Sequence, residues 1–253
     1  MNILLSGING FMGKEVVKII NQTDGLNLVG GVDVNADENC PVTCVKTFNE
    51  ANEKILKNCE VNCIIDFSHH SATNDLINFA VENKIPLVLA TTGQTEEEKQ
   101  VILNASKYIP LFYSANYSLG VALLVELAKK TASAFPDAEI EIIEKHHNRK
   151  IDAPSGTALM IADAIKTVRP ETYVHNGRSG QGKREKNEIG VHAIRMGNIV
   201  GEHEVIVGTQ NQQITLKHEA FSRSLFAEGA ISAVKFLEGK PIGHYTMTDI
   251  VKG

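Results

Sequence analysis

The 253-residue sequence has little of what several classes of protein require. Positive charge is not in excess, because 25 lysines and arginines stand against 30 aspartates and glutamates, for a net charge of −5 with histidine neutral. This balance is untypical of a general nucleic-acid-binding protein. Apolar runs such as Val121–Val125 are far shorter than the roughly 20 residues of a membrane-spanning helix. The first residues show no signal-peptide pattern, so we expect a cytoplasmic protein without membrane or nucleic-acid partners.

Cysteine is also scarce. The four cysteines form two C-x₃-C pairs, Cys40/Cys44 and Cys59/Cys63, whose spacing falls within the range of zinc ligands. However, Cys63 lies within the apolar run Val61–Asp66, which predicts a buried strand, and a free cysteine packs there as a small apolar side chain. Neither pair has glycine-rich surroundings, so we expect no metal site.

The first half of the sequence alternates apolar strand-like runs with stretches long enough to be helices. Such alternation predicts an α/β fold with a doubly wound, Rossmann-type parallel sheet covered on both faces. The predicted strands are Asn2–Ser6, Leu26–Val32, Val61–Asp66, Pro86–Ala90 and Pro110–Tyr113, and the predicted helices are Phe11–Asn21, Thr47–Lys57, Ser71–Asn83 and Glu96–Lys107.

The pattern changes near Ser118. Three strand-like runs follow one another with little helix between them, which predicts a second α+β domain with a mixed or antiparallel sheet. Its predicted elements are helices Ser118–Phe135 and Ser155–Val168, an extended run Ala138–His147, a polar loop Gly177–Asn187, and strands Glu188–Met196, Glu204–Gly208 and Gln213–His218. A last amphipathic helix is predicted at Arg223–Glu238.

A glycine turn joins the first predicted strand to the first helix. Gly7, Gly10 and Gly13 let the backbone approach a pyrophosphate at the start of the helix. Asp33 ends the second strand, 20 residues after Gly13, where an acid binds the adenine ribose hydroxyls. Asp33 would repel a 2′-phosphate, and the next basic residue, Lys46, lies 13 positions on. A dinucleotide site that prefers NADH is therefore predicted. The alternative is a tight turn and an ordinary strand-end aspartate with no cofactor role, which would give the same sequence pattern.

The stretch Glu144–Ala158 combines histidines with a helix start. His146 suits proton transfer near neutral pH, and in a continuous strand it would point away from His147. The backbone N–H groups of Gly156 and Thr157 begin a helix that can bind a carboxylate. With Lys150 nearby, this pattern predicts a pocket for an acidic small molecule, while a solvated basic turn is the alternative.

Several motifs occur together in a fixed order. They are the glycine turn, Asp66-Phe-Ser, Thr91-Thr-Gly, Ser114-Ala-Asn-Tyr-Ser-Leu-Gly, the block from Glu144 to Ala158, and Gly190-Val-His-Ala-Ile-Arg195. Over nearly the whole chain, the sequence resembles the 4-hydroxy-tetrahydrodipicolinate (dihydrodipicolinate) reductases. The resemblance implies NAD(P)H-dependent reduction of a cyclic dicarboxylic imine with loss of water, in lysine biosynthesis through diaminopimelate.

The resemblance also implies roles for residues and domains. It makes His146 and Lys150 the catalytic proton donors, and His147, Gly156 and Thr157 the substrate-binding residues. Residues 1–117 and 225–253 would form the dinucleotide-binding domain, and 118–224 a domain for substrate binding and assembly into a homotetramer. The implied cofactor-binding residues are Gly7, Ile8, Asn9, Gly10, Phe11, Met12, Asp33, Ala90, Thr91, Thr92, Ser114, Ala115, Asn116 and Tyr117.

Two departures from the family pattern bear on the cofactor. Val34 stands where members often have an arginine, which supports NADH and leaves NADPH use open; Ala90 replaces a commoner glycine. Two alternatives remain: a non-catalytic dinucleotide sensor, or another Rossmann-fold dehydrogenase acting on a small acid. A semialdehyde dehydrogenase is disfavoured, because it needs a nucleophilic cysteine and all four cysteines precede residue 64.

Overall fold

The computed structural model describes residues 1–37 and 39–253. Within them the chain forms two compact units, residues 1–118 with 224–253, and residues 119–223. We describe each unit separately. No helix in the described ranges has both the length and the apolar character needed to cross a bilayer.

The first unit is built on a seven-stranded sheet in which every pairing is parallel. Its order is β12-β6-β5-β4-β1-β2-β3, so the strand order reverses between β1 and β4. Open α/β sheets bind ligands at such a reversal, beyond the carboxyl ends of the strands. The strands are β1 (Asn2–Ser6), β2 (Asn27–Val32), β3 (Cys44–Val45), β4 (Cys63–Asp66), β5 (Leu87–Leu89), β6 (Pro110–Tyr113) and β12 (Gly243–Tyr245).

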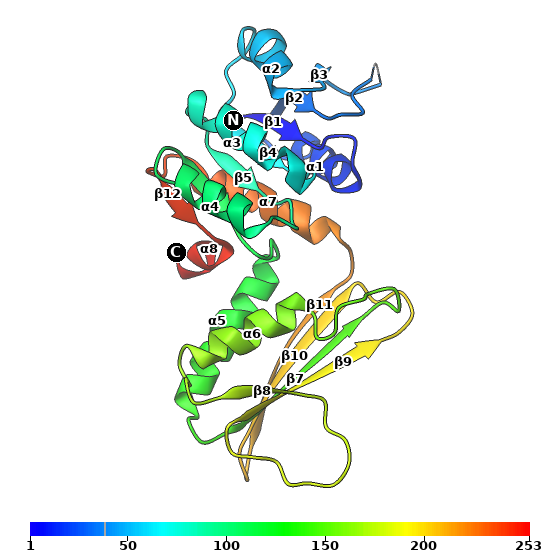
Figure 1. Ribbon diagram of the computed structural model, residues 1–253, viewed down its shortest axis with the longest axis vertical. Coiled ribbons are helices and arrows are strands. Elements are labelled where there is room, and N and C mark those ends of the chain that lie inside the picture. The colour runs from blue at the N-terminus through cyan, green and yellow to red at the C-terminus, as the bar shows by residue number, and fades with distance from the viewer. Residues whose placement is uncertain (38) are drawn as a thin grey trace. The chain divides into compact units, whose positions relative to one another are not determined.

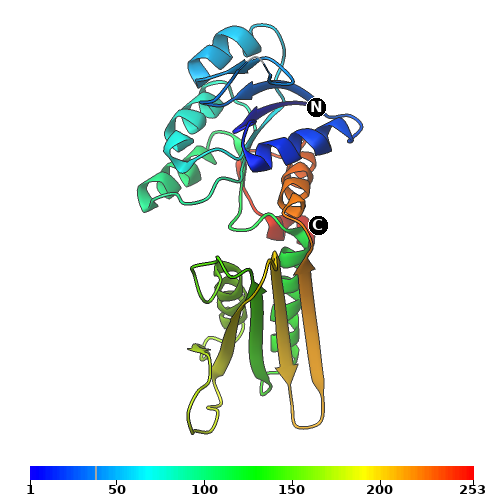
Figure 2. The same cartoon turned by 90° about the vertical axis from the view of Figure 1, so that its right-hand side faces the viewer.

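Helices cover both faces of this sheet (Figure 2). Alternate strand residues point to opposite faces, and β6 shows both: Leu111 joins a core with helices α2 to α4, whereas the Phe112 ring lies 6.2 Å from that of Phe236 in α7. The helices are α1 (Phe11–Asn21), α2 (Phe48–Ala51), which continues as the π-helical η1 (Asn52–Leu56), the 3₁₀ turn η2 (His70–Ala72), α3 (Thr73–Glu82), α4 (Glu96–Ala105), α7 (Ser224–Leu237) and α8 (Met247–Lys252).

The second unit has a five-stranded sheet in the order β11-β10-β7-β9-β8. The sheet is mixed, because β7 and β8 pair parallel to β9 while β10 runs antiparallel to β7 and β11. Both helices of the unit lie on one side of the sheet (Figure 1). The elements are α5 (Leu119–Ala134), β7 (Glu139–His146), α6 (Gly156–Lys166), β8 (Tyr173–Asn176), β9 (Glu188–Arg195), β10 (Gly201–Gly208) and β11 (Gln213–Ala220).

The predicted fold class, a doubly wound parallel sheet plus a second mixed-sheet unit, is confirmed. The patterns did not predict β3, β8, β12 and α8, which are all short. They also left open where the last amphipathic helix packs. The structure shows that α7 packs on α1 and on strands β4 to β6 of the first unit.

Candidate active site

The glycine turn after β1 is closely packed. Gly7 has a φ of +79°, and a Cβ there would lie 2.4 Å from the carbonyl oxygen of Phe67. A Cβ on Gly13 would lie 2.1 Å from the carbonyl oxygen of Gly7. Gly10 is the N-cap of α1, and within the described residues its end of the helix has no side-chain cap. The first N–H groups of α1 therefore remain available to a phosphate.

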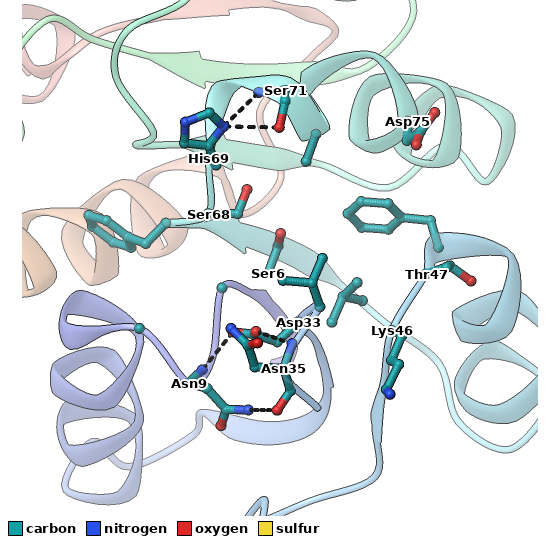
Figure 3. Close-up of a pocket in the computed structure, with 17 residues that line it drawn as sticks. Ser6, Asn9, Asp33, Asn35, Lys46, Thr47, Ser68, His69, Ser71 and Asp75 are labelled. Atoms are coloured by element: carbon teal, nitrogen blue, oxygen red, sulfur yellow. Dashed lines mark hydrogen bonds between the residues drawn. The ribbon is translucent and has the colours of Figure 1, made fainter. Parts of the chain in front are cut away.

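Asp33 lies at the end of β2 and organises this turn. Its carboxylate accepts hydrogen bonds from the backbone N–H of Asn9 at 2.9 Å and of Asn35 at 2.8 Å (Figure 3). The Asn9 side chain in turn donates to the Asn35 carbonyl at 2.9 Å. Asp33 and the turn border a cavity of about 640 Å³.

Lys46 lines the same cavity as Asp33 (Figure 3). Separation along the sequence suggested that no basic residue was close to Asp33. The short strand β3 overturns that argument, because Val45 pairs with Val32 and so brings the next residue, Lys46, beside the end of β2. A cation and an anion therefore both face the space where the adenine ribose was predicted.

A second cavity, of about 500 Å³, shares Phe67, Ser68 and His69 with the first. Most of the residues that line it directly follow the carboxyl ends of β4, β5 and β6. Predicted cofactor residues at its wall are Met12, Ala90, Thr91, Thr92, Ser114, Ala115, Asn116 and Tyr117.

Tyr117 is a structural part of this wall. Its hydroxyl lies 2.8 Å from the Leu89 carbonyl oxygen and 3.0 Å from that of Phe112, and burial raises its pKa well above the ordinary value. The hydroxyl thus stays protonated and holds the ends of β5 and β6. Two predicted cofactor residues, Ile8 and Phe11, line neither of these two cavities in the part of the chain described: Ile8 is buried in the core and Phe11 is 66% exposed.

The edge of the first unit fits a dinucleotide. The turn leaves no room for a Cβ at Gly7 or Gly13, the start of α1 is open, and a carboxylate stands at the end of β2. These are the three parts that hold a pyrophosphate and an adenine ribose in Rossmann folds.

His146 ends β7 in the second unit and is hydrogen-bonded to a buried carboxylate. Its Nδ1 lies 2.6 Å from Glu144, whose side chain is fully buried. Glu144 also accepts two hydrogen bonds from the Arg195 guanidinium, at 2.7 and 2.8 Å, and one from the backbone N–H of Ser155 at 2.9 Å. Burial opposes ionisation of Glu144, but these donors outweigh it and lower its pKa to about 2.

A second histidine, His203 of β10, packs edge-on against His146, with 5.2 Å between ring centroids. Its Nε2 lies 3.1 Å from the hydroxyl of Ser155, which caps α6 by accepting from the N–H of Ala158. Burial, aided by the neighbouring charge of His146, lowers the pKa of His203 to about 4. His203 is therefore neutral near pH 7.

The loop between β7 and α6 contains Lys150, whose ammonium lies 2.8 Å from the carboxylate of Asp152. The hydrogen bond from Lys150 and another from the backbone N–H of Gly156 lower the pKa of Asp152. Lys150 and the Gly156 N–H, which were predicted to bind a substrate carboxylate, thus bind the carboxylate of Asp152 in this structure. Burial and nearby arginines lower the pKa of His147, and its Nδ1 is buried with no hydrogen-bond partner among the described residues.

Taken together, the parallel sheet with a Rossmann strand order and the closely packed glycine turn define a dinucleotide-binding class of protein. Family models described as dihydrodipicolinate reductase, N-terminus and C-terminus, match residues 1–117 and 120–251. The chain therefore belongs to the dihydrodipicolinate reductase family, as its motifs predicted, and is an oxidoreductase with a nucleotide-binding Rossmann domain.

Individual relatives agree with this assignment. A 4-hydroxy-tetrahydrodipicolinate reductase of Caldanaerobacter subterraneus subsp. tengcongensis is 47% identical over 100% of this chain and 98% of its own. One of Clostridium novyi is 43% identical, with coverage of 99% and 98%. The structure of a dipicolinate-bound dihydrodipicolinate reductase from Paenisporosarcina sp. TG-14 superposes with a TM-score of 0.81 over 99% of each chain, at 23% identity, and supports the fold.

The sequence patterns assigned no role to Glu144, Arg195, His203, Lys46 or Asp152. Glu144, Asp152 and Arg195 lie within motifs that carried the family resemblance, which was the one available signal. Among residues 1–37 and 39–253 no group of three or more histidine, cysteine or acidic side chains gathers as a metal site would require.

Proposed function

We propose that this chain reduces 4-hydroxy-tetrahydrodipicolinate to tetrahydrodipicolinate, with loss of water, in lysine biosynthesis through diaminopimelate. The observation that carries the proposal is the hydrogen bond between His146 and the buried Glu144, beside the start of α6. A non-catalytic nucleotide sensor would have no use for a histidine held by a buried carboxylate next to a carboxylate-binding loop.

Residues 1–117 and 225–253 are proposed as the dinucleotide-binding domain, with the cofactor site beyond the carboxyl ends of the strands of the first unit. When bound, NADH or NADPH supplies the hydride. The backbone of Gly7–Met12 and the start of α1 bind the pyrophosphate, and Asp33 binds the adenine ribose. Residues of the second cavity, Ala90–Thr92 and Ser114–Tyr117, orient the rest of the cofactor.

Residues 118–224 are proposed as the substrate-binding domain, with the substrate site in the second unit. Gly156 and Thr157 at the start of α6 bind one carboxylate of the substrate, with Lys150 as its counter-charge. The unpartnered Nδ1 of His147 supports a hydrogen bond to the same molecule. His146 transfers the proton that completes reduction at the ring, and Lys150 is a second proton donor. Asp152 must give up Lys150 and the Gly156 N–H as the substrate carboxylate arrives.

NADH is the proposed preferred cofactor. Asp33 lies where a 2′-phosphate would meet it, and like charges this close repel. Lys46 on the same cavity supports use of NADPH as well, because its ammonium offsets part of that repulsion. The preference is therefore proposed to be a matter of degree.

A homotetramer in the cytoplasm is proposed from the family resemblance. The face of the second unit's sheet that α5 and α6 leave uncovered supports assembly (Figure 1). On that face the half-buried isoleucines Ile143 and Ile206 and the exposed Ile194 accompany charged neighbours.

Initial rates of NADH and NADPH oxidation, followed at 340 nm, test the function. The substrate is made in situ from pyruvate and aspartate semialdehyde by the preceding synthase. Substrate-dependent oxidation that favours NADH is expected. Oxidation that favours NADPH would keep the reaction and reject the cofactor preference. Nucleotide binding without oxidation would reject the reaction in favour of a sensor.

A further inference from the structure

We infer that Glu144 is the positioning residue of His146 and that Arg195 keeps Glu144 charged. This inference rests on the proposed function, because it explains how His146 is prepared for proton transfer. It adds a role for two side chains that belong to neither the proposed cofactor-binding set nor the proposed substrate-binding set.

The strand geometry places the two side chains together. Glu144 and His146 are two positions apart on β7, so they project from the same face of the sheet. Their contact is 2.6 Å, between a carboxylate oxygen and the ring Nδ1. An ionised carboxylate only accepts hydrogen bonds, so the ring must carry its hydrogen on Nδ1. Nε2 is then the nitrogen left to exchange a proton.

Space beside Nε2 is kept open by a glycine. Gly201 lies at the start of β10, and a Cβ there would be 3.1 Å from Nε2 of His146. Any larger residue would press on the exchanging nitrogen. The Nδ1 edge of His146 is thus hydrogen-bonded to Glu144, whereas Gly201 places no side chain against the Nε2 edge.

Arg195 accounts for the charge of the buried Glu144. The parallel pairing of β9 with β7 sets Arg195 opposite His146, and the guanidinium binds both carboxylate oxygens. A fully buried carboxylate without such a partner would take up a proton. A protonated Glu144 would present a hydroxyl to the ring and so remove the reason for Nδ1 to carry hydrogen.

The same carboxylate also fixes the turn before α6. One oxygen of Glu144 accepts the Ser155 N–H, while the other accepts from Nδ1 of His146. Glu144→Gln separates these two roles. The amide oxygen continues to accept from Ser155 and from one Arg195 nitrogen. The amide nitrogen replaces the oxygen that accepts from the other Arg195 nitrogen and from the ring, so that one hydrogen bond of Arg195 is lost and hydrogen on Nε2 of His146 is favoured.

Glu141→Gln is a matched control. Glu141 lies on the same strand but on the opposite face, and it too joins a histidine and an arginine: His192 at 2.8 Å and Arg184 at 3.1 Å. The same chemical change is thus made on the same strand, but on the face of the sheet opposite to His146. The oligomeric state of both variants is recorded, because Glu141 lies on the face proposed for assembly.

For Glu144→Gln we expect kcat to fall roughly 10- to 100-fold, with the KM of the dicarboxylate within about threefold of wild type. The Kd for NADH and the kinetics of Glu141→Gln should match wild type. An unchanged kcat, or an equal loss in Glu141→Gln, would overturn the inference.

The decisive readout is made on the wild type, with the variant as a comparison. In ¹⁵N-histidine NMR of the wild-type holoenzyme, we expect the neutral His146 ring to carry its hydrogen on Nδ1, and Glu144→Gln to shift the population toward Nε2. Hydrogen on Nε2 in the wild type would overturn the inference even if Glu144→Gln failed to fold. An enzyme that does not turn over the substrate but shows Nδ1–H would instead reject the proposed function.

Discussion

The carboxylate of Asp33 lies 2.9 Å from the backbone nitrogen of Asn9, so the end of β2 is tied to the turn that follows β1. The residue proposed to select the cofactor therefore also shapes the loop proposed to bind its pyrophosphate. A substitution of Asp33 should therefore affect binding of both the adenine ribose and the pyrophosphate.

Replacement of Asp33 by alanine should weaken NADH binding about 10-fold or more, because hydrogen bonds to a charged carboxylate are lost. NADPH should lose less, since the repulsion of its 2′-phosphate disappears at the same time. Fluorescence titration gives both Kd values, and the exposed Asp24→Ala is the control. Unchanged NADH affinity would show that Asp33 does not contact the ribose.

Lys46→Met should raise the Kd for NADPH about 3- to 10-fold at low ionic strength and leave that for NADH within twofold. The expected loss is modest because Lys46 is exposed and solvent screens its charge. Calorimetry with 2′,5′-ADP and with 5′-AMP separates the phosphate contact from turnover. Lys57→Met removes an exposed charge elsewhere on the same unit and serves for comparison. Equal effects on both nucleotides would contradict the role of Lys46.

His146→Gln should lower turnover by roughly 10²- to 10⁴-fold, as expected when a general acid is removed. NADH affinity should not change, because the two sites are built from different units. Steady-state rates and an NADH titration test both points, with His175→Gln on β8 as the histidine control. Wild-type turnover in the variant would end the proton-transfer assignment.

Asp152→Asn should strengthen binding of a dicarboxylate such as dipicolinate several-fold. The aspartate holds Lys150 at 2.8 Å and also accepts from Gly156, so a ligand carboxylate competes with it. The gain should shrink as salt is added, because the contact is partly exposed. Weaker binding to the variant in calorimetry would mean that Asp152 supports the site instead of competing for it.

The stability of the protein should fall as pH drops below neutral. His203 has its pKa lowered from 6.5 to about 4 by burial, so the unfolded chain binds a proton in this interval and the folded chain does not. Its contribution is complete above pH 6.5 and should be about 2 kcal/mol smaller at pH 5. Below about pH 4.5 the lowered pKa of Glu144, about 2, adds a further loss.

Urea unfolding at pH 7 and pH 5 measures the first of these losses. His203→Gln keeps a polar group near Ser155 but has no proton to gain, so its free energy of unfolding should drop less between the two pH values. An equal drop in wild type and variant would assign the pH dependence to other groups.

Much of the fold was predictable because its central strands are continuous apolar runs. Strands β1 and β6 have the predicted bounds, and the predicted helix over Thr47–Lys57 is present as α2 followed by η1. Strand β12 has only three residues, one of them a glycine, and pairs with β6 far earlier in the sequence. Nothing local distinguishes such a segment from a loop.

The parts of the site that are formed by neighbouring residues in the sequence were predictable. The parts that depend on the pairing of distant strands were not. The glycine turn and the start of α6 each consist of residues that are adjacent in the sequence. Arg195 binds Glu144 across 51 positions, and Lys46 reaches the Asp33 cavity only through β3. The pairing between Glu144 and Arg195 and the position of Lys46 both arise from strand register, which sequence periodicity does not reveal.

The return of α7 to the first unit has a consequence for synthesis on the ribosome. This helix contacts β4, β5 and β6, yet it is translated only after the whole of Leu119–Arg223. Part of one apolar face of the sheet therefore stays uncovered while the intervening unit is synthesised. The interrupted unit is thus completed last, and until then its uncovered apolar face is of the kind that makes folding intermediates prone to aggregation.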